Sequence, residues 1–325
     1  MRDTILFGDC KETLCAFLPE SARTCVTSPP YYGLRNYGDE ENQIGQEESP
    51  EEYVQNLVEV FREVRKILTD DGTLWLNMGD SYYNYRPGKG QGLVKQTVSN
   101  TKQDLPDKCA RRGNKLDGLK EKDLIGIPWM VAFALRADGW YLRQDIIWHK
   151  PNPMPESVKD RCTKSHEYIF LLTKNKKYYY DHEAIKEKAV GERWGGNKPI
   201  NMNNTKDTNN QFSGLTRPRK MVYDKRNKRS VWKVTNRPYR GTHFAVFPPE
   251  LITDCIKAGR QEGDIVLDPF MGSGTTAMVA KSLGRDYIGC ELHEDYGNLI
   301  QERVQDFHPV GEVSQEPSVN IFDIV

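Results

Sequence analysis

A small hydroxyl, two prolines and an aromatic ring stand side by side in one short run, Ser28-Pro29-Pro30-Tyr31. Two consecutive prolines cannot donate to a sheet ladder, and Pro29 biases Ser28 toward extended backbone. The run is therefore a stiff corner that presents carbonyl oxygens, one hydroxyl and a ring. These groups suit a flat ring that carries an amino group. A Pro-Pro turn whose only role is to end a strand would have the same sequence.

A glycine-rich turn much later in the chain, from Asp268 to Gly274, is the second stretch that could do chemistry. Its glycines allow the backbone to approach a ligand closely. Glu291 ends the next strand-like segment, where an acid can accept hydrogen bonds from a ribose diol. The lysine of a phosphate-binding loop is missing, because Thr275 follows Gly274 directly, and Asp268 favours a cation over an anion. The pair predicts an adenosine-containing ligand.

The periodicity of apolar residues predicts the elements that hold these two stretches. Strands and helices alternate over the first 80 residues, which favours a parallel α/β sheet, and the segments 141–148 and 167–173 are expected to form its antiparallel edge. The turn at 70–72 is expected to end the helix that Ser49 caps. We expect strands at 5–7, 24–27, 73–78, 141–148, 167–173, 265–268 and 287–291, and helices at 11–18, 50–68, 127–135, 248–258, 275–283 and 295–304.

The formal net charge of zero hides two basic segments. Residues 196–240 contain twelve lysines and arginines against two acids, and residues 86–120 contain nine against three. Both segments lack apolar periodicity, and aromatic residues are interleaved with the basic residues of the later one. Such segments either are solvated loops or bind a polyanion locally.

Composition bounds the class of protein. The 325 residues fit one large domain or two small ones, and no stretch of about 18 apolar residues predicts a membrane span. We expect no signal peptide, because Met1 leads straight into a strand-like segment. The seven cysteines form no Cys-x-x-Cys pair and no histidine spacing suggests zinc, so we expect reduced thiols in a cytoplasmic protein without a metal site.

Together, Ser-Pro-Pro-Tyr at 28–31 and Asp-Pro-Phe-x-Gly-Ser-Gly-Thr-Thr at 268–276 resemble the motifs of DNA amino-methyltransferases that use S-adenosyl-L-methionine. The order, with the catalytic motif first, the cofactor loop last and a basic region between, is similar to the circularly permuted β-group of that family. The resemblance covers about residues 4–80 and 125–305. It implies a class I, Rossmann-like α/β sheet, circularly permuted, with an inserted irregular basic lobe for target recognition, in a protein of bacterial, archaeal or phage origin.

The resemblance also implies a division of the chain. It assigns 1–180 to the catalytic part, with a basic insertion at about 81–122, and 181–240 to target recognition. It assigns 241–310 to the cofactor-binding part and 311–325 to a loosely ordered tail.

Roles follow for the positions that match the family, and for the basic residues near them. The catalytic residues are Ser28, Pro29, Pro30 and Tyr31. The residues expected to bind S-adenosylmethionine are Asp9, Phe244, Asp268, Pro269, Phe270, Gly272, Ser273, Gly274, Thr275 and Glu291. Those expected to contact double-stranded DNA are Arg35, Lys150, Asn152, Arg217, Arg219, Lys220, Arg226, Lys228 and Arg229.

The implied mechanism needs no covalent enzyme intermediate. Hydrogen bonds from an exocyclic amino group to Ser28 Oγ and the Pro29 carbonyl favour a pyramidal nitrogen, whose lone pair is then free to attack the sulfonium methyl group. Tyr31 is expected to stack on a base that has left the duplex. Methylation at carbon 5 of cytosine needs a cysteine, normally after proline, and no Pro-Cys pair occurs.

Several alternatives stay open at this point. Ser28 resembles the cytosine-N4 enzymes, whereas adenine-N6 enzymes more often have Asp or Asn there, but all three residues offer an acceptor oxygen. A non-catalytic nucleic-acid-binding subunit is disfavoured by the intact motifs, and an RNA or protein methyltransferase by the motif order and the basic insert. A homodimer and a cognate restriction endonuclease that acts separately stay open as protein partners.

Overall fold

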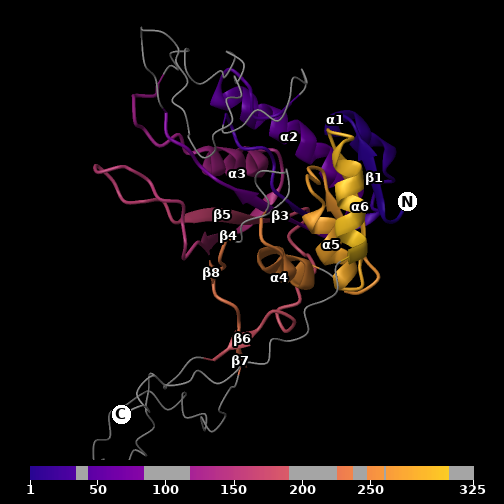
Figure 1. Cartoon of the computed structure of the whole chain (residues 1–325). Coiled ribbons are helices and arrows are strands. Elements are labelled where there is room, and N and C mark those ends of the chain that lie inside the picture. The colour runs from indigo at the N-terminus through magenta and orange to yellow at the C-terminus, as the bar shows by residue number, and fades with distance from the viewer. Residues whose placement is uncertain (34–42, 84–117, 190–224, 237–246, 260, 307–325) are drawn as a thin grey trace, which may run out of the picture.

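The structure, a computed structural model, describes residues 1–33, 43–83, 118–189, 225–236, 247–259 and 261–306. These residues build one eight-stranded sheet in the order β1-β10-β9-β2-β3-β5-β4-β8, with β1 near the N-terminus at one end and β8 at the other (Figure 1). A separate antiparallel pair, β6 and β7, lies off this sheet. The strands are β1 (Thr4–Phe7), β2 (Ala22–Thr27), β3 (Leu68–Met78), β4 (Tyr141–His149), β5 (His166–Thr173), β6 (Glu187–Lys188), β7 (Lys225–Arg226), β8 (Val231–Lys233), β9 (Ile265–Asp268) and β10 (Asp286–Glu291).

The order of the strands confirms the permuted parallel sheet that the sequence predicts. The first five strands of the order are parallel to one another, yet β9 and β10 come from the last fifth of the chain and lie between β1 and β2. Val266 and Leu267 of β9 pair with Thr24 and Cys25 of β2. Parallel neighbours end at the same edge of a sheet, so the turn after β9 meets the corner after β2.

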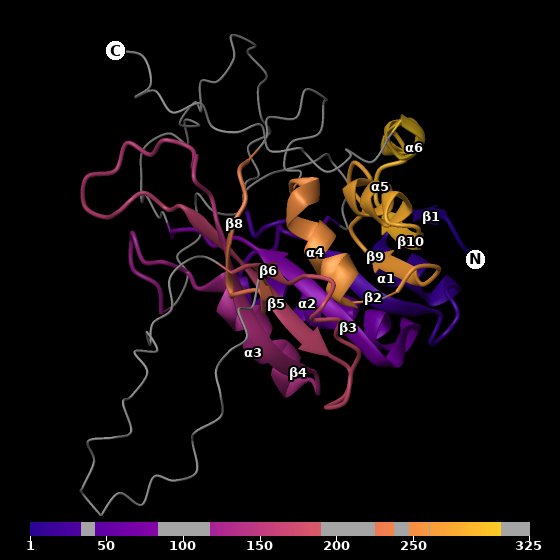
Figure 2. The same cartoon turned by 90° about the horizontal axis from the view of Figure 1, so that it is seen from below.

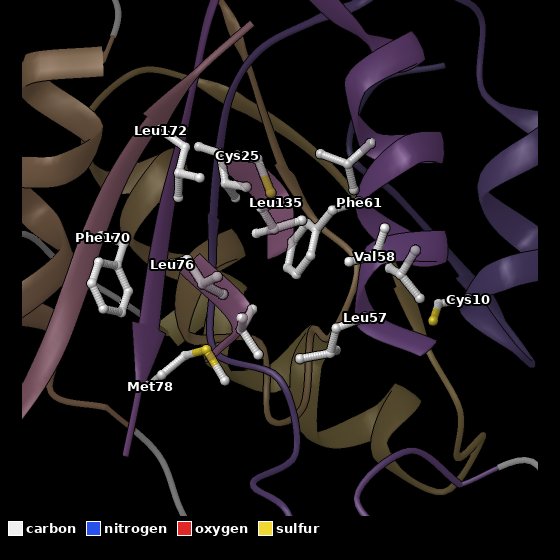
Figure 3. Packing of buried hydrophobic residues seen from close by; sticks show 14 of the residues in the cluster. Cys10, Cys25, Leu57, Val58, Phe61, Leu76, Met78, Leu135, Phe170 and Leu172 are labelled. Atoms are coloured by element: carbon white, nitrogen blue, oxygen red, sulfur yellow. The ribbon is translucent and has the colours of Figure 1, made fainter. Parts of the chain in front are cut away.

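Helices cover both faces of the sheet, in three layers. Successive residues of a strand point to opposite faces, so Leu74 and Leu76 pack with α2 and α3, whereas Trp75 packs with α4 and α5. Figure 2 shows α4, α5 and α6 on one side of the strands, and Figure 3 shows the other core, where Leu76 and Leu172 lie in one cluster with Phe61. The helices are α1 (Cys10–Thr13), α2 (Pro50–Ile67), α3 (Ile127–Ala137), α4 (Pro249–Gly259), α5 (Thr275–Ser282) and α6 (Tyr296–Asp306), with a short 3-10 turn at Leu14–Ala16.

The helix α2 begins as predicted but ends earlier than expected. Ser49 caps it, because its hydroxyl accepts a hydrogen bond from the Glu52 N–H at 3.1 Å, and Pro50 fills the first turn. The helix ends at Ile67 rather than at the turn 70–72, since Leu68 already pairs with Ala22 of β2. The strand β3 therefore includes the acidic turn sequence, with a register irregularity opposite Ala22 and Thr24.

The antiparallel pair at the end of the sheet is confirmed, but it is not the edge. β4 and β5 are antiparallel as predicted, and β8 then adds in parallel to β4. Trp232 of β8 is buried 6.4 Å from the Trp75 ring, and the Trp148 indole donates a hydrogen bond to the Val234 carbonyl at 2.9 Å. Three residues of the basic segment thus belong to the main sheet because a tryptophan anchors them.

The expectations for the two basic insertions and for the C-terminal tail concern mainly residues outside the described ranges. The greater part of the basic insertion, the centre of the basic lobe and the tail at 311–325 are among them. Within the described residues, no helix is long and apolar enough to cross a membrane.

Candidate functional site

The corner at residues 28–31 is held from two neighbouring elements. The Tyr53 hydroxyl of α2 donates a hydrogen bond to the Pro30 carbonyl at 2.9 Å. The Tyr31 ring lies against Gly79, which follows β3; a Cβ atom at Gly79 would be 2.6 Å from Tyr31 Cε2. Glycine at this position is therefore what lets the ring approach the end of β3. The corner directly follows β2, so its groups lie at the carboxyl edge of the sheet.

The Tyr31 hydroxyl belongs to a polar cluster that sequence reasoning missed. It lies 2.8 Å from Glu167 Oε2, 3.2 Å from Asn77 Oδ1 and 3.4 Å from Ser28 Oγ. Burial, and then the Glu167 carboxylate, raise the pKa of Tyr31 well above its usual value, so the phenol stays protonated. The expected stacking of Tyr31 on a base remains a prediction, because no base is present to test it.

Glu167 enters the site from the antiparallel strand β5. Tyr168 pairs with Met78, so the start of β5 lies beside the end of β3, next to the corner. A polar residue at the start of a strand antiparallel to β3 is the signal that could have identified Glu167 from the sequence. The local sequence, however, does not show that Glu167 lies beside Tyr31, because this depends on the pairing of β5 with β3.

Lys150 is part of the same cluster. Its ammonium group forms an ion pair with Glu167, both side chains are only 16% exposed, and it lies 4.1 Å from the centre of the Trp148 ring. Asn152, two residues on, exchanges hydrogen bonds with the backbone of Asn236 at 3.0 and 3.1 Å. Of the two, Lys150 is thus brought to the catalytic corner and Asn152 fastens the following loop to the segment after β8. Contacts of either residue with DNA remain predictions.

Asp268 ties the glycine turn to the catalytic corner. Its Oδ1 accepts hydrogen bonds from Thr27 Oγ1 at 2.6 Å and from the Phe270 N–H at 3.0 Å, and its Oδ2 accepts one from Thr276 Oγ1 at 2.6 Å. The residue is 1% exposed, and burial raises the pKa of its carboxyl to about 6 despite these hydrogen bonds. Thr27 directly precedes Ser28, so the carboxylate joins strands β9 and β2. Both carboxylate oxygens have internal partners, and the expected contact of Asp268 with a cationic ligand remains a prediction.

Glu291 closes the other side of the glycine turn. Its carboxylate accepts hydrogen bonds from the Gly272 N–H at 2.7 Å and from the His293 N–H at 3.0 Å, and burial raises its pKa to about 7. Its own carbonyl accepts a hydrogen bond from the Gly8 N–H at 2.9 Å, which brings the end of β1 alongside. Asp9 therefore lies at the same edge, where its side chain accepts a hydrogen bond from the Lys11 N–H at 2.9 Å at the start of α1.

The start of α5 offers donors without internal partners. Gly274 is left-handed (φ +79°) at the N-cap and supplies no side-chain cap, so the first N–H groups of the helix lack a side-chain acceptor. Thr275 Oγ1 is buried and has no hydrogen-bond partner. Free donors at a helix N-terminus suit a carboxylate, and an acid such as Glu291 suits a ribose. The residues present therefore fit the carboxylate and the ribose of S-adenosylmethionine, and each individual contact stays a prediction.

Three of the basic residues expected to contact DNA are paired with acids. Arg226 and Arg229 both form ion pairs with Glu187, at 2.7 and 3.0 Å. Lys228 pairs with Asp254 of α4 and lies 4.6 Å from the centre of the Trp232 ring. These pairs hold the β6–β7 pair and β8 in place, and Arg229, whose side chain is 67% exposed, is the most open of the three to a phosphate.

Five predicted site residues fall outside the described ranges, and the structure says nothing of them. They are Arg35, Arg217, Arg219, Lys220 and Phe244. Among the residues that are described, no cluster of His, Cys, Asp and Glu side chains could hold a metal ion.

Comparison with known proteins gives concordant matches over almost the whole chain. A family model for N6/N4 methyltransferases, described as DNA methylase, matches residues 22–302. The Type II methyltransferase M.SmaI of Serratia marcescens is 46% identical over 305 residues, which cover 92% of this chain and 90% of that protein. M.Cfr9I of Citrobacter freundii, another Type II methyltransferase, is 45% identical over 93% of this chain and 87% of that protein.

Solved structures share the fold at lower identity. The PvuII DNA methyltransferase, described as cytosine-N4-specific, has a TM-score of 0.60 at 17% identity, covering 98% of this chain and 89% of that one. The M1.HpyAVI–SAM complex has a TM-score of 0.51 at 17% identity, covering 93% of this chain and 98% of that one.

Proposed function

Because this chain belongs to the family of S-adenosylmethionine-dependent DNA methyltransferases that act on exocyclic amino groups, we propose that its target is the N4 amino group of cytosine in a specific DNA sequence. The observation that carries this choice is Ser28 at the first position of the catalytic corner, within reach of the Tyr31 hydroxyl. Adenine-N6 methylation, with the same mechanism, is the alternative.

The corner supplies the acceptors that the amino group needs. Ser28 Oγ and the Pro29 carbonyl accept hydrogen bonds from the two N–H groups, which favours a pyramidal nitrogen with an available lone pair. When bound, S-adenosylmethionine supplies an activated methyl group on a positively charged sulfur. Thr27 and Asp268, whose side chains are 2.6 Å apart, fix the corner relative to the glycine turn, so the amino group and the methyl donor are held at neighbouring strand ends.

The base reaches this corner only outside the duplex. Pro29 is buried, and Ser28 and Tyr31 are half-buried, so an amino group that still pairs inside a double helix cannot approach them. We therefore include base extrusion in the proposal. The described relatives are Type II methyltransferases, which supports a cytoplasmic role for this chain in restriction–modification beside a separately acting endonuclease.

Modified nucleosides in host DNA test the proposal. The protein is expressed in cells that lack other DNA methyltransferases, and the DNA is digested and analysed by mass spectrometry and sequencing. We expect N4-methylcytosine in one short motif, its loss in Ser28→Ala, and its retention in Ser21→Ala, a control serine whose hydroxyl bonds the Leu18 carbonyl away from the corner.

The other outcomes separate the competing functions. N6-methyladenine in place of N4-methylcytosine would refute the choice of base and leave the methyltransferase class intact. A protein that binds S-adenosylmethionine and DNA but leaves both bases unmodified would favour a non-catalytic subunit.

A further inference from the structure

A chain of hydrogen-bonding groups runs from the catalytic serine to a buried ion pair. Ser28 Oγ lies 3.4 Å from the Tyr31 hydroxyl, which lies 2.8 Å from Glu167 Oε2. The second carboxylate oxygen of Glu167 accepts a hydrogen bond from Lys150. The corner supplies Ser28 and Tyr31, the start of β5 supplies Glu167, and the residue after β4 is Lys150. The proposed role of Ser28 uses only the first of these four.

The direction of these hydrogen bonds depends on the Glu167 carboxylate, which can accept hydrogen bonds but cannot donate them. Glu167 forms an ion pair with the Lys150 ammonium, and a carboxylate in an ion pair is an acceptor only. The single hydrogen of Tyr31 is therefore drawn to Glu167, because a hydrogen bond to a charged acceptor is about twice as strong as one between neutral groups.

Asn77 reinforces the same direction. Its amide nitrogen donates to the Tyr168 carbonyl at 3.0 Å and lies 3.4 Å from Glu167 Oε2, which turns its oxygen toward Tyr31. The two neighbours of the Tyr31 hydroxyl on this side, Glu167 and Asn77 Oδ1, are then both acceptors. The Tyr31 oxygen is left to accept a hydrogen, and Ser28 is the hydroxyl within reach that can donate one.

We propose that Glu167 is a positioning residue that acts through Tyr31 to make Ser28 a hydrogen-bond acceptor for the amino group of the target base. Once the hydrogen of Ser28 points to Tyr31, the lone pairs of Ser28 Oγ face the site. A serine hydroxyl that pointed its hydrogen at the amino nitrogen would instead bind the lone pair needed for attack. This inference rests on the proposed function. It adds Glu167 as the residue that makes Ser28 Oγ an acceptor rather than a donor.

The alternative is that the Lys150–Glu167 ion pair has only a structural role and stabilises the packing of β5 against the residue that follows β4. Both roles predict that Glu167 matters for folding, so a test needs a variant of the same shape. Glu167→Gln keeps the size of the side chain, but Lys150 can only donate and so attracts the amide oxygen. The amide nitrogen then faces Tyr31 as a donor, so Tyr31 loses its charged acceptor and keeps only the neutral Asn77 Oδ1, and its hydrogen is no longer held firmly away from Ser28.

The experiment measures single-turnover methyl transfer from S-adenosylmethionine to unmethylated plasmid DNA. For Glu167→Gln we expect the transfer rate to fall by about 10- to 100-fold, the loss typical when a partner that orients a functional side chain is removed. The dissociation constants for S-adenosylmethionine and for DNA should stay within about twofold of wild type. Glu63→Gln, which breaks a surface pair with Lys66 on α2, is the matched control and should transfer at the wild-type rate.

A double-mutant cycle with Tyr31→Phe decides between acting through Tyr31 and acting independently. If Glu167 acts through the Tyr31 hydroxyl, adding Glu167→Gln to Tyr31→Phe slows transfer no further. If the two reductions multiply, Glu167 acts on its own and the inference is wrong. Should Glu167→Gln lose cofactor binding, the same question is asked with Glu167→Asp, which keeps the acceptor and should retain more activity than Tyr31→Phe.

Failure of this inference is distinguishable from failure of the proposed function. A wild type that methylates cytosine, together with an unimpaired Glu167→Gln variant, refutes the inference alone. A wild type that methylates adenine refutes the proposed choice of base. The role of Glu167 is then still decided by the double-mutant cycle. A wild type that binds cofactor and DNA but transfers nothing refutes both, because no amino group is then accepted by Ser28.

Discussion

Replacing Asp268 by asparagine is expected to stabilise this protein at neutral pH, even though Asp268 accepts three hydrogen bonds. Asparagine can keep the same pattern of contacts. Its oxygen can accept from Thr27 and from the Phe270 N–H, and its amide can donate to Thr276 Oγ1, whose own hydrogen can turn to the Val26 carbonyl 3.4 Å away. What the substitution removes is the charge of a fully buried carboxylate.

The pKa of Asp268 gives the magnitude and the sign. Burial raises it from 3.8 to about 6 in the folded protein, a difference that corresponds to about 3 kcal/mol. Because the folded state holds its proton more tightly than the unfolded state, the wild type loses stability as pH rises from about 4 to about 6. Above that range the carboxylate is ionised in both states, and the asparagine variant should be more stable by up to about 3 kcal/mol.

Urea denaturation of both proteins between pH 4.5 and 8 measures this difference. We expect the two free energies of unfolding to converge at the acid end and to separate as pH rises to about 6, with the variant more stable. Glu291, whose pKa is raised by burial and also by the charge of Asp268, adds to the pH dependence of both proteins and cancels only in part in the difference. A variant that is less stable by several kcal/mol at pH 7.5, with no convergence on acidification, would refute the reasoning, since the hydrogen bonds to the carboxylate would then outweigh its desolvation.

Three further predictions follow from single contacts. Gly79→Ala forces a Cβ atom to within 2.6 Å of the Tyr31 ring, so we expect single-turnover transfer to fall at least about tenfold with unchanged S-adenosylmethionine affinity by calorimetry; a wild-type rate would show that the ring position is unimportant. Ser49→Ala removes the cap of α2 and should lower the free energy of unfolding by about 1 kcal/mol in urea while sparing methyl transfer, and a loss below a few tenths would contradict the role of the cap. Because burial raises the pKa of Glu291 to about 7, S-adenosylmethionine should bind more tightly as pH rises from 6 to 8, and Glu291→Gln should abolish that slope; an identical slope in the variant would exclude Glu291 as its source.

Much of the fold was predictable because its signals are local. Alternating strand and helix patterns predict the parallel sheet. That β9 lies beside β2 follows only from the resemblance to the permuted family. The cap of α2 was predictable from Ser49-Pro50. The strand β8 was not, because three residues in a basic segment show no alternation and their pairing with β4 is a contact across some 80 residues.

The parts of the site that could not be predicted are those made by long-range contacts. The sequence identified Asp268 by its motif, yet its partner Thr27 lies 241 positions away, and only that contact shows the carboxylate turned inward. Glu167 carries no motif, and its meaning comes from Tyr31, 136 positions earlier. The charge of Arg226 and Lys228 was visible in the sequence, but the acids that pair with them, Glu187 and Asp254, were not.

The interleaved order of the strands delays completion of the sheet while the protein is synthesised on the ribosome. β2 can pair with β3 early, but its other edge, and the edge of β1 that faces β10, stay unpaired until β9 and β10 have been made, roughly 200 residues after the end of β3. At about 5–20 residues per second, that delay lasts roughly 10 to 40 s. During this time the nascent chain carries two bare strand edges, which are natural targets for chaperones or for mispairing. The site therefore stays incomplete through most of the synthesis of the chain, since Thr27 must wait for the 241 residues that lead to Asp268.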